Sequence, residues 1–241
     1  MQAASSGSTV FSTIGSAQTG ISYDLDIWLP AGYAQSTITY PVIYAMDCEY
    51  RFATLRQVME QRAAQAILVH VCAMGSDRRW VDFTMPGAQR YYKFIVAELV
   101  PWVERSYRAQ SNRRTLSGHS LSAQFVLYAL FMENPSSRIF QSFISEECSC
   151  WYDASKVFSQ DLAQPLTMEQ AMFEADHDLP VNLVMAGDTF GNERFLQTVY
   201  ARLMARQYAR LRATHTVYSL GHVPMDGPAF NDALEFIFDR P

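Results

Sequence analysis

The sequence predicts an α/β fold in which helices cover both faces of a mostly parallel central sheet. The chain has 241 residues, of which 49% are hydrophobic and 18% charged, enough for one large domain with a sizeable core. Short apolar runs alternate with longer helical patterns from end to end, as in folds built from right-handed strand–helix–strand units. We therefore expect a single domain over residues 21–241, preceded by a flexible N-terminal segment, residues 1–20.

The first half of the chain contains apolar or alternating runs that predict strands, and amphipathic runs that predict helices. The alternating run ISYDLDIWLP stops at Pro30, as a strand with one exposed face does. The run QAILVHVCAM has no polar face, which is typical of a parallel strand covered on both sides. Pro101 bends or restarts the second helix. The expected strands are 21–30, 40–47 and 65–74, and the expected helices are 50–64 and 90–107.

The second half continues the alternation around one irregular acidic stretch. Residues 146–178 hold eight acidic residues and one lysine, a net charge of −7, and we expect them to form a reduced cap near the site. Their carboxylates are solvated or pair with the arginine-rich helix that follows. The expected strands are 113–118, 140–145, 180–187 and 214–221, and the expected helices are 120–134, 192–211 and 227–240.

Composition excludes several classes of protein. The net charge of −5 disfavours a nucleic-acid partner, and no apolar run is long enough to span a bilayer. The first residues lack the basic and apolar regions of an intact signal peptide, although a secreted protein whose signal has been removed looks the same. The four cysteines fit no zinc-binding spacing, so we expect thiols in a reducing, cytoplasmic compartment. A disulfide, as between Cys148 and Cys150, stays open.

The stretch LSGHSLSA, residues 116–123, matches the motif G-x-S-x-G except that Ser122 replaces the last glycine. It lies between a predicted strand and a predicted helix, which is the context of the nucleophile elbow in α/β-hydrolases. Such a turn presents a serine clear of the backbone and aims the next amide at the oxyanion formed during attack. We therefore expect Ser120 to be a nucleophile and the amide of Leu121 to bind the oxyanion.

A nucleophilic serine needs a general base, and only one of the five histidines follows the last predicted strand. That residue, His222, lies in SLGHVPMDG at the carboxyl edge of the sheet, where ligands bind in such folds. His119 lies inside the elbow, and we expect its side chain to point away from the site. His70 is placed within an apolar strand, where a core role is favoured.

The acid that orients His222 is expected after the strand 180–187. Asp188 follows directly and is the first choice, Glu193 is the alternative, and a Ser–His dyad without an acid also stays open. The second oxyanion amide is expected in the loop after strand 40–47, from Cys48 or Glu49.

Several side chains near the expected strand ends are candidates for substrate binding. Arg51, Arg78 and Arg79 carry the charge to hold a carboxylate or catecholate oxygen, and Trp151 is a candidate aromatic wall. The proposed reaction needs no metal ion and no cofactor.

Several stretches, in order, resemble the branch of the α/β-hydrolase superfamily that contains esterase-D-like enzymes and siderophore trilactone esterases. They cover roughly residues 20–240. They are YDLDIWLPAGY, YPVIYAMDCEYRF, DRRWVDFTMPG, the elbow with its flanking helices, and GHVPMDGPAF. The resemblance implies an α/β-hydrolase fold acting on a small-molecule ester. The sequence departs from the family at Cys48, where the family has glycine beside the oxyanion hole, and at Ser122 in the elbow. It also departs at SEECSC, where the family often has serine-proline.

The sequence thus predicts a serine hydrolase that cleaves carboxylic esters through an acyl-enzyme, with siderophore-type and aromatic esters as candidate substrates. Two alternatives stay open. The same triad serves acyltransferases, and the two departures are compatible with a non-catalytic binding protein of the same fold.

Overall fold

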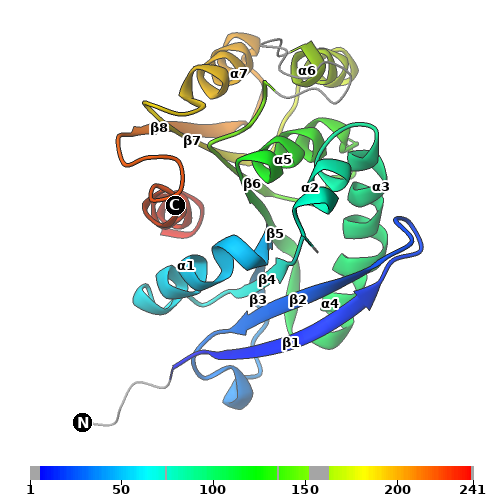
Figure 1. Ribbon diagram of the computed structural model, residues 1–241, viewed down its shortest axis with the longest axis vertical. Coiled ribbons are helices and arrows are strands. Elements are labelled where there is room, and N and C mark those ends of the chain that lie inside the picture. Colours follow the sequence, from blue (N-terminus) through cyan, green and yellow to red (C-terminus); the bar gives the residue numbers. More distant parts are fainter. Residues whose placement is uncertain (1–5, 74, 135, 152–162, 240–241) are drawn as a thin grey trace.

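A computed structural model describes residues 6–73, 75–134, 136–151 and 163–239. The described strands form one eight-stranded sheet in the order β1-β2-β4-β3-β5-β6-β7-β8 (Figure 1). The strands β3 to β8 run parallel, while β2 pairs antiparallel with both β1 and β4. The strands are β1 (Ser8–Gly15), β2 (Ser22–Leu29), β3 (Tyr40–Met46), β4 (Ile67–Val71), β5 (Ala109–His119), β6 (Ser142–Glu146), β7 (Asn182–Asp188) and β8 (Arg212–Tyr218).

Helices cover both faces of this sheet, as predicted (Figure 1). Alternate residues of each central strand point to opposite faces. Tyr44 and Leu116 enter the larger core, whereas Ile43 and Ile144 enter the smaller core under α1 and α8. The helices are α1 (Cys48–Gln61), α2 (Ser76–Asp82), α3 (Gly87–Phe94), α4 (Val100–Ser106), α5 (Leu121–Met132), α6 (Ala163–Ala175), α7 (Glu193–Arg206) and α8 (Asp226–Leu234), with π-helical turns at Ile95–Leu99 and Glu235–Asp239.

The expected flexible N-terminal segment is wrong over residues 8–15, which form β1. This strand pairs with β2 in continuous register from Ser8 opposite Leu29 to Gly15 opposite Ser22. Its side chains are mostly exposed, and only Ile14 is buried as part of the main core. A strand at the sheet edge needs backbone pairing more than apolar side chains, so its pattern is weak in the sequence.

The helix expected over 90–107 is interrupted. Two further helices, α2 and α6, lie outside the expected ones. The π-helical turn separates α3 from α4, and Pro101 stands in the first turn of α4, where the helix restarts. The acidic stretch contains α6, which packs against α5 and α7. The carboxylate of Glu169 on α6 pairs with Arg202 and Arg206, as expected for acids facing the arginine-rich helix. The remainder of the expected cap, residues 152–162, lies outside the described residues.

The expectation of free thiols is wrong, because all four cysteines are paired. Cys48 at the start of α1 is bonded to Cys72 after β4, and Cys148 is bonded to Cys150. The first pair is distant in sequence and meets only because β3 and β4 are neighbours in the sheet. Through the described ranges, no helix combines the length and apolarity required to cross a membrane.

Candidate active site

Ser120 occupies a sharp turn between the end of β5 and the start of α5. Its backbone lies at φ 61° and ψ −118°, a region that L-residues adopt only under constraint. A Cβ atom on Gly118 would lie 2.4 Å from the carbonyl oxygen of Ser122, so only glycine fits there. The amide of Leu121 begins α5 and has no partner within the helix by its position. This is the expected geometry of a nucleophile elbow.

Ser122, the unusual last residue of the elbow, is buried and makes three hydrogen-bond contacts. Its Oγ accepts from the amide of His119 at 3.0 Å and lies 2.7 Å from the Asp47 carboxylate and 2.9 Å from the His119 carbonyl oxygen. Asp47 in turn accepts from Nε of Arg79 at 2.7 Å. The serine therefore connects the elbow to the start of α1, a link that glycine would lack.

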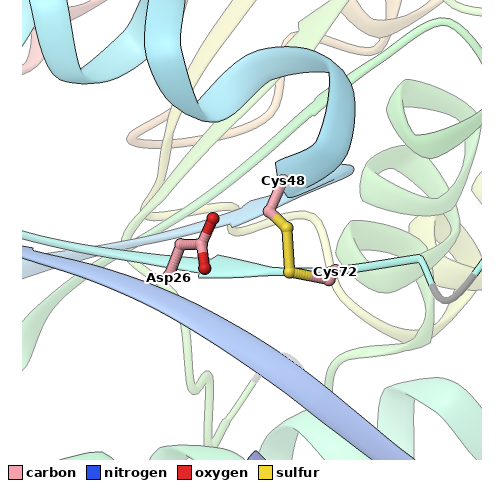
Figure 2. A group of neighbouring side chains, drawn as sticks. All are labelled: Asp26, Cys48 and Cys72. Carbon is pink, nitrogen blue, oxygen red and sulfur yellow. A yellow bond between two sulfur atoms is a disulfide. The ribbon is translucent and has the colours of Figure 1, made fainter. Parts of the chain in front are cut away.

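The start of α1 lies beside the elbow because β3 and β5 are parallel neighbours. Asp47 precedes the helix with a left-handed φ of 70°, and Cys48 and Glu49 supply amides of its first turn. The disulfide to Cys72 ties this turn to the end of β4 (Figure 2). Together with Asp26 these cysteines are the one group of potential metal ligands in the described ranges, but their sulfur atoms are bonded to each other and are not thiolates.

His222, on the loop after β8, contacts a carboxylate. Its Nδ1 lies 2.7 Å from Oε2 of Glu147, and its side chain is partly exposed. A carboxylate only accepts hydrogen bonds, so in the neutral imidazole Nδ1 carries the proton and Nε2 has the lone pair. A histidine in this tautomer can take a proton from a hydroxyl group.

Glu147 follows β6 and is fully buried. Its carboxylate also accepts the amide of Asp188 at 2.6 Å and the amide of Asn192 at 3.1 Å. A Cβ atom on Gly191 would lie 2.1 Å from Oε2 of Glu147, so the glycine leaves the space in which the carboxylate sits. The surrounding backbone thus fixes this acid in one position.

The structure therefore places neither expected acid on His222. Asp188 is buried and accepts the amides of Leu220 at 2.8 Å and Gly221 at 2.7 Å, so it holds the loop that carries the histidine. Hydrogen bonds to Asp188, that from Phe190 foremost, lower the pKa of its carboxyl below its usual value. The alternative acid, Glu193, instead contacts His215 on β8 at 3.1 Å. The available signal for Glu147 was its position two residues after the expected strand 140–145, at the same sheet edge.

His119 also differs from expectation, because its side chain contacts the site. Its Nε2 donates to the carbonyl oxygen of His222 at 2.7 Å, and the two rings are 4.7 Å apart. Burial lowers the pKa of His119 to about 4, so it is a neutral donor at neutral pH. It links the elbow directly to the histidine loop.

The three candidate anion-binding arginines all engage acidic side chains. Arg51 is only 3% exposed and binds Glu146 and Asp226 in a buried cluster, so the expected contact of Arg51 with substrate is wrong. Arg78 pairs with Asp82 on its own helix, and Arg79 with Asp47. Contacts of Arg78 and Arg79 with substrate stay a prediction.

Trp151 is half-buried beside the acid. Its Nε1 donates to Oδ1 of Asn192 at 2.9 Å, and Asn192 donates from Nδ2 to the carbonyl oxygen of Glu147 at 2.9 Å. The indole therefore supports Glu147 through Asn192. Its role as a substrate wall stays a prediction.

An eight-stranded α/β sheet, a serine elbow after the central strand β5 and a histidine–carboxylate pair at the same edge define a serine hydrolase of the α/β-hydrolase fold. The family model described as “Putative esterase” matches residues 16–186. The chain belongs to this esterase family and is a serine carboxylic-ester hydrolase.

Known relatives agree with this fold. The ferri-bacillibactin esterase BesA of Bacillus subtilis (strain 168) is 24% identical over 235 residues, covering 82% of this chain and 78% of BesA. An IroE-like serine hydrolase from Shewanella oneidensis superposes with a TM-score of 0.80 at 22% identity, covering 96% of this chain and 80% of that one. The siderophore hydrolase EstA from Aspergillus nidulans superposes with a TM-score of 0.76 at 19% identity, covering 95% and 93%.

Proposed function

We propose that this esterase acts through a catalytic triad of Ser120, His222 and Glu147. The contact that carries the proposal is the 2.7 Å hydrogen bond between Nδ1 of His222 and Glu147. It fixes the imidazole in the tautomer that a general base requires. The elbow geometry of Ser120 supplies the nucleophile at the same edge of the sheet.

The reaction proceeds in two steps. Ser120 Oγ attacks the ester carbonyl carbon while Nε2 of His222 takes its proton, and the alcohol leaves with that proton as the acyl-enzyme forms. His222 then removes a proton from water, which attacks the acyl carbonyl. His222 returns that proton to Ser120 Oγ as the acyl–oxygen bond breaks and the acid is released. The amide of Leu121 and that of Cys48 or Glu49 hold the oxyanion in both steps. Glu147 stabilises the imidazolium in each.

The substrate is inferred to be a siderophore-type ester that carries an aromatic or apolar group. Two of the similar proteins are named for siderophore substrates. Large apolar side chains also lie exposed on segments that follow the strand ends, which favours an apolar substrate surface. Phe190 after β7 is 87% exposed, Val223 beside His222 is 71% exposed and Tyr50 on α1 is 61% exposed.

Replacement of the nucleophile tests the proposal. Ser120→Ala is expected to reduce hydrolysis of p-nitrophenyl butyrate by at least about 1,000-fold while the protein stays folded. Ser137→Ala, an exposed serine after α5, is the matched control and should keep full activity. Wild-type rates in folded Ser120→Ala would contradict the triad.

Two further measurements separate the alternatives. A fluorophosphonate probe should label Ser120, as located by peptide mass spectrometry, whereas a non-catalytic binding protein would stay unlabelled. Added acceptor alcohols should leave the yield of free acid unchanged, because an acyltransferase would divert the acyl group to the alcohol. A panel of aromatic esters, aliphatic esters and catecholate trilactones then identifies the substrate.

The two disulfides favour folding in an oxidising compartment rather than the expected cytoplasmic one. Intact-mass measurement of protein alkylated without reduction tests this. Four unmodified cysteines in protein from its native source support the oxidising compartment, and four alkylated ones contradict it.

A further inference from the structure

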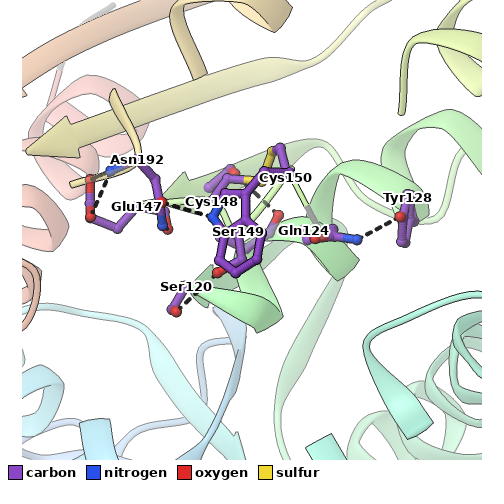
Figure 3. Close-up of a disulfide and its surroundings, with 11 residues drawn as sticks. Ser120, Gln124, Tyr128, Glu147, Cys148, Ser149, Cys150 and Asn192 are labelled. Atoms are coloured by element: carbon purple, nitrogen blue, oxygen red, sulfur yellow. Dashed lines mark hydrogen bonds between the residues drawn. A yellow bond between two sulfur atoms is a disulfide. The ribbon is translucent and has the colours of Figure 1, made fainter. Parts of the chain in front are cut away.

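The turn Glu147–Cys150 contacts two of the proposed catalytic side chains at once. Oε2 of Glu147 accepts from Nδ1 of His222. Two residues further on, Oγ of Ser149 lies 3.2 Å from Oγ of Ser120, and Figure 3 shows this pair. The amide of Ser149 also donates to the carbonyl oxygen of Ser120 at 3.0 Å. The Cys148–Cys150 disulfide closes the chain between these contacts.

We infer that this disulfide is a positioning element for the esterase reaction. It holds the Glu147 carboxylate on His222 and the Ser149 hydroxyl on Ser120. The inference rests on the triad proposed above, and it adds Ser149 as a further residue in contact with the nucleophilic oxygen.

The backbone of the turn explains why a covalent bridge is useful here. Glu147 has a left-handed φ of 52°, which is unfavourable for a residue with a side chain. Its amide donates to the carbonyl oxygen of Ala186 at 2.7 Å, so the strained residue is anchored on the sheet at one end. The disulfide begins at Cys148, the residue directly after Glu147, and restrains the turn on that side. The Glu147 carboxylate therefore cannot move away from His222 by relaxation of the turn.

The spacing of the two cysteines argues against a role in global stability. A disulfide stabilises a fold mainly by shortening the unfolded chain, and this effect grows with the length of the closed loop. Cys148 and Cys150 are two residues apart, whereas Cys48 and Cys72 are separated by 24. The short bridge therefore restricts local geometry, and the geometry that it restricts belongs to Glu147 and Ser149.

Burial makes this restriction effective. The side chains of Cys148, Ser149 and Glu147 are all buried, and the turn is packed beneath Asn192 and the start of α7. Ser149 contacts Ser120 in this packed setting both through its hydroxyl and through its amide. The hydroxyl contact at 3.2 Å favours one orientation of the Ser120 side chain before substrate binds.

The test uses Cys148→Ser, Cys150→Ser and the double variant, each of which breaks the same bridge while keeping side-chain volume. Each is expected to lower kcat for p-nitrophenyl butyrate about 10- to 100-fold and to leave KM within about twofold, because positioning acts on the transition state. The loss of kcat should be equal in the three variants, because each of them removes the same single disulfide. The matched control is Ser142→Ala at the other end of β6, which should lower the melting temperature without lowering kcat.

Ser149→Ala keeps the bridge and removes only the hydroxyl contact, and it is expected to lower kcat about tenfold at unchanged KM. This variant takes the place of the bridge variants if those fail to fold. Wild-type kcat in a folded bridge variant or in Ser149→Ala overturns the inference. It is also overturned if the losses of kcat in Cys148→Ser and Cys150→Ser add in the double variant. Failure of the proposed triad is a separate result, in which Ser120→Ala keeps wild-type activity.

Discussion

At the scale of the residue, the candidate site is built from left-handed backbone positions. Asp47, Ser120 and Glu147 have φ values of 70°, 61° and 52°, and each comes directly after a parallel strand. Such conformations are unfavourable for side-chain-bearing residues and persist only where the surrounding structure holds them. Here they place a carboxylate, a hydroxyl and a second carboxylate at one edge of the sheet.

The first prediction separates the carboxylates at this edge. Glu147→Gln should lower kcat about 100- to 10,000-fold, because an amide favours the wrong tautomer of His222. Glu193→Gln is the matched control, and its kcat should stay within about twofold of the wild-type value because Glu193 contacts His215 instead of His222. Steady-state kinetics on purified, folded variants decide the question. A larger loss of kcat in Glu193→Gln than in Glu147→Gln would instead favour Glu193, the alternative acid expected after strand 180–187.

At the scale of the element, one buried arginine joins three segments of the site. Arg51 on α1 donates to Glu146 at the end of β6 at 2.5 Å and to Asp226 at the start of α8 at 2.7 Å. These segments carry the proposed oxyanion amides, the proposed acid and the end of the loop that contains His222. The attraction of Arg51 lowers the pKa of Asp226 despite its burial. The cluster thus fixes how the three segments lie relative to one another.

The second prediction concerns this cluster. Arg51→Met should destabilise the fold by about 3–5 kcal/mol, because it leaves two buried acidic groups without their cation. Arg56→Met on the same helix is the matched control, since Arg56 is exposed and pairs with Glu60 one turn away. Arg56→Met should lower the free energy of unfolding by less than about 0.5 kcal/mol. Urea denaturation measures both, and equal losses would show that the buried cluster adds nothing specific.

At the scale of the whole molecule, stability depends on links between elements distant in sequence. The Cys48–Cys72 disulfide joins α1 to the end of β4. His70 on β4 is fully buried, and its Nε2 bonds to the carbonyl oxygen of Met46 on β3 at 2.8 Å. Both links reinforce the pairing of β3 with β4. The chain continues from β3 into α1 and from β4 toward α2.

The third prediction compares the two disulfides. Cys48→Ala with Cys72→Ala should cost about 3 kcal/mol of unfolding free energy, from the chain entropy of a loop of this length. Cys148→Ala with Cys150→Ala should cost clearly less unfolding free energy, because these two cysteines are only two residues apart and close a very short loop. Denaturation under non-reducing conditions measures both. A larger loss from the short bridge would contradict the entropic account.

The fourth prediction concerns acid sensitivity. Burial lowers the pKa of His70 to about 3, so the folded state stays neutral where the unfolded state takes up a proton. The stability that His70 contributes is present above its unfolded pKa of about 6.5 and is lost as pH falls toward 3, by up to about 1.4 kcal/mol per pH unit. Unfolding free energy in His70→Gln should therefore fall less steeply across this window than in the wild type. Parallel pH profiles would contradict the assignment.

The sequence by itself determined the α/β fold and the pattern of its principal strands and helices. It also placed Ser120 after one strand and His222 after another, at one sheet edge. These features depend on local hydrophobic periodicity and on a short motif, both of which are written into neighbouring residues. The edge strand β1 was missed because its exposed side chains leave little periodicity to read.

Only the tertiary structure decided which acid faces His222 and which cysteines pair. Glu147, Asp188 and Glu193 lie in or beside loops that follow parallel strands, so sequence position does not distinguish them. Hydrogen bonds in the folded structure distinguish them. The amides of Leu220 and Gly221 donate to Asp188, whereas one carboxylate oxygen of Glu147 accepts from His222. Such choices depend on distances of a few ångströms between residues far apart in the chain, and these exist only once the sheet has formed.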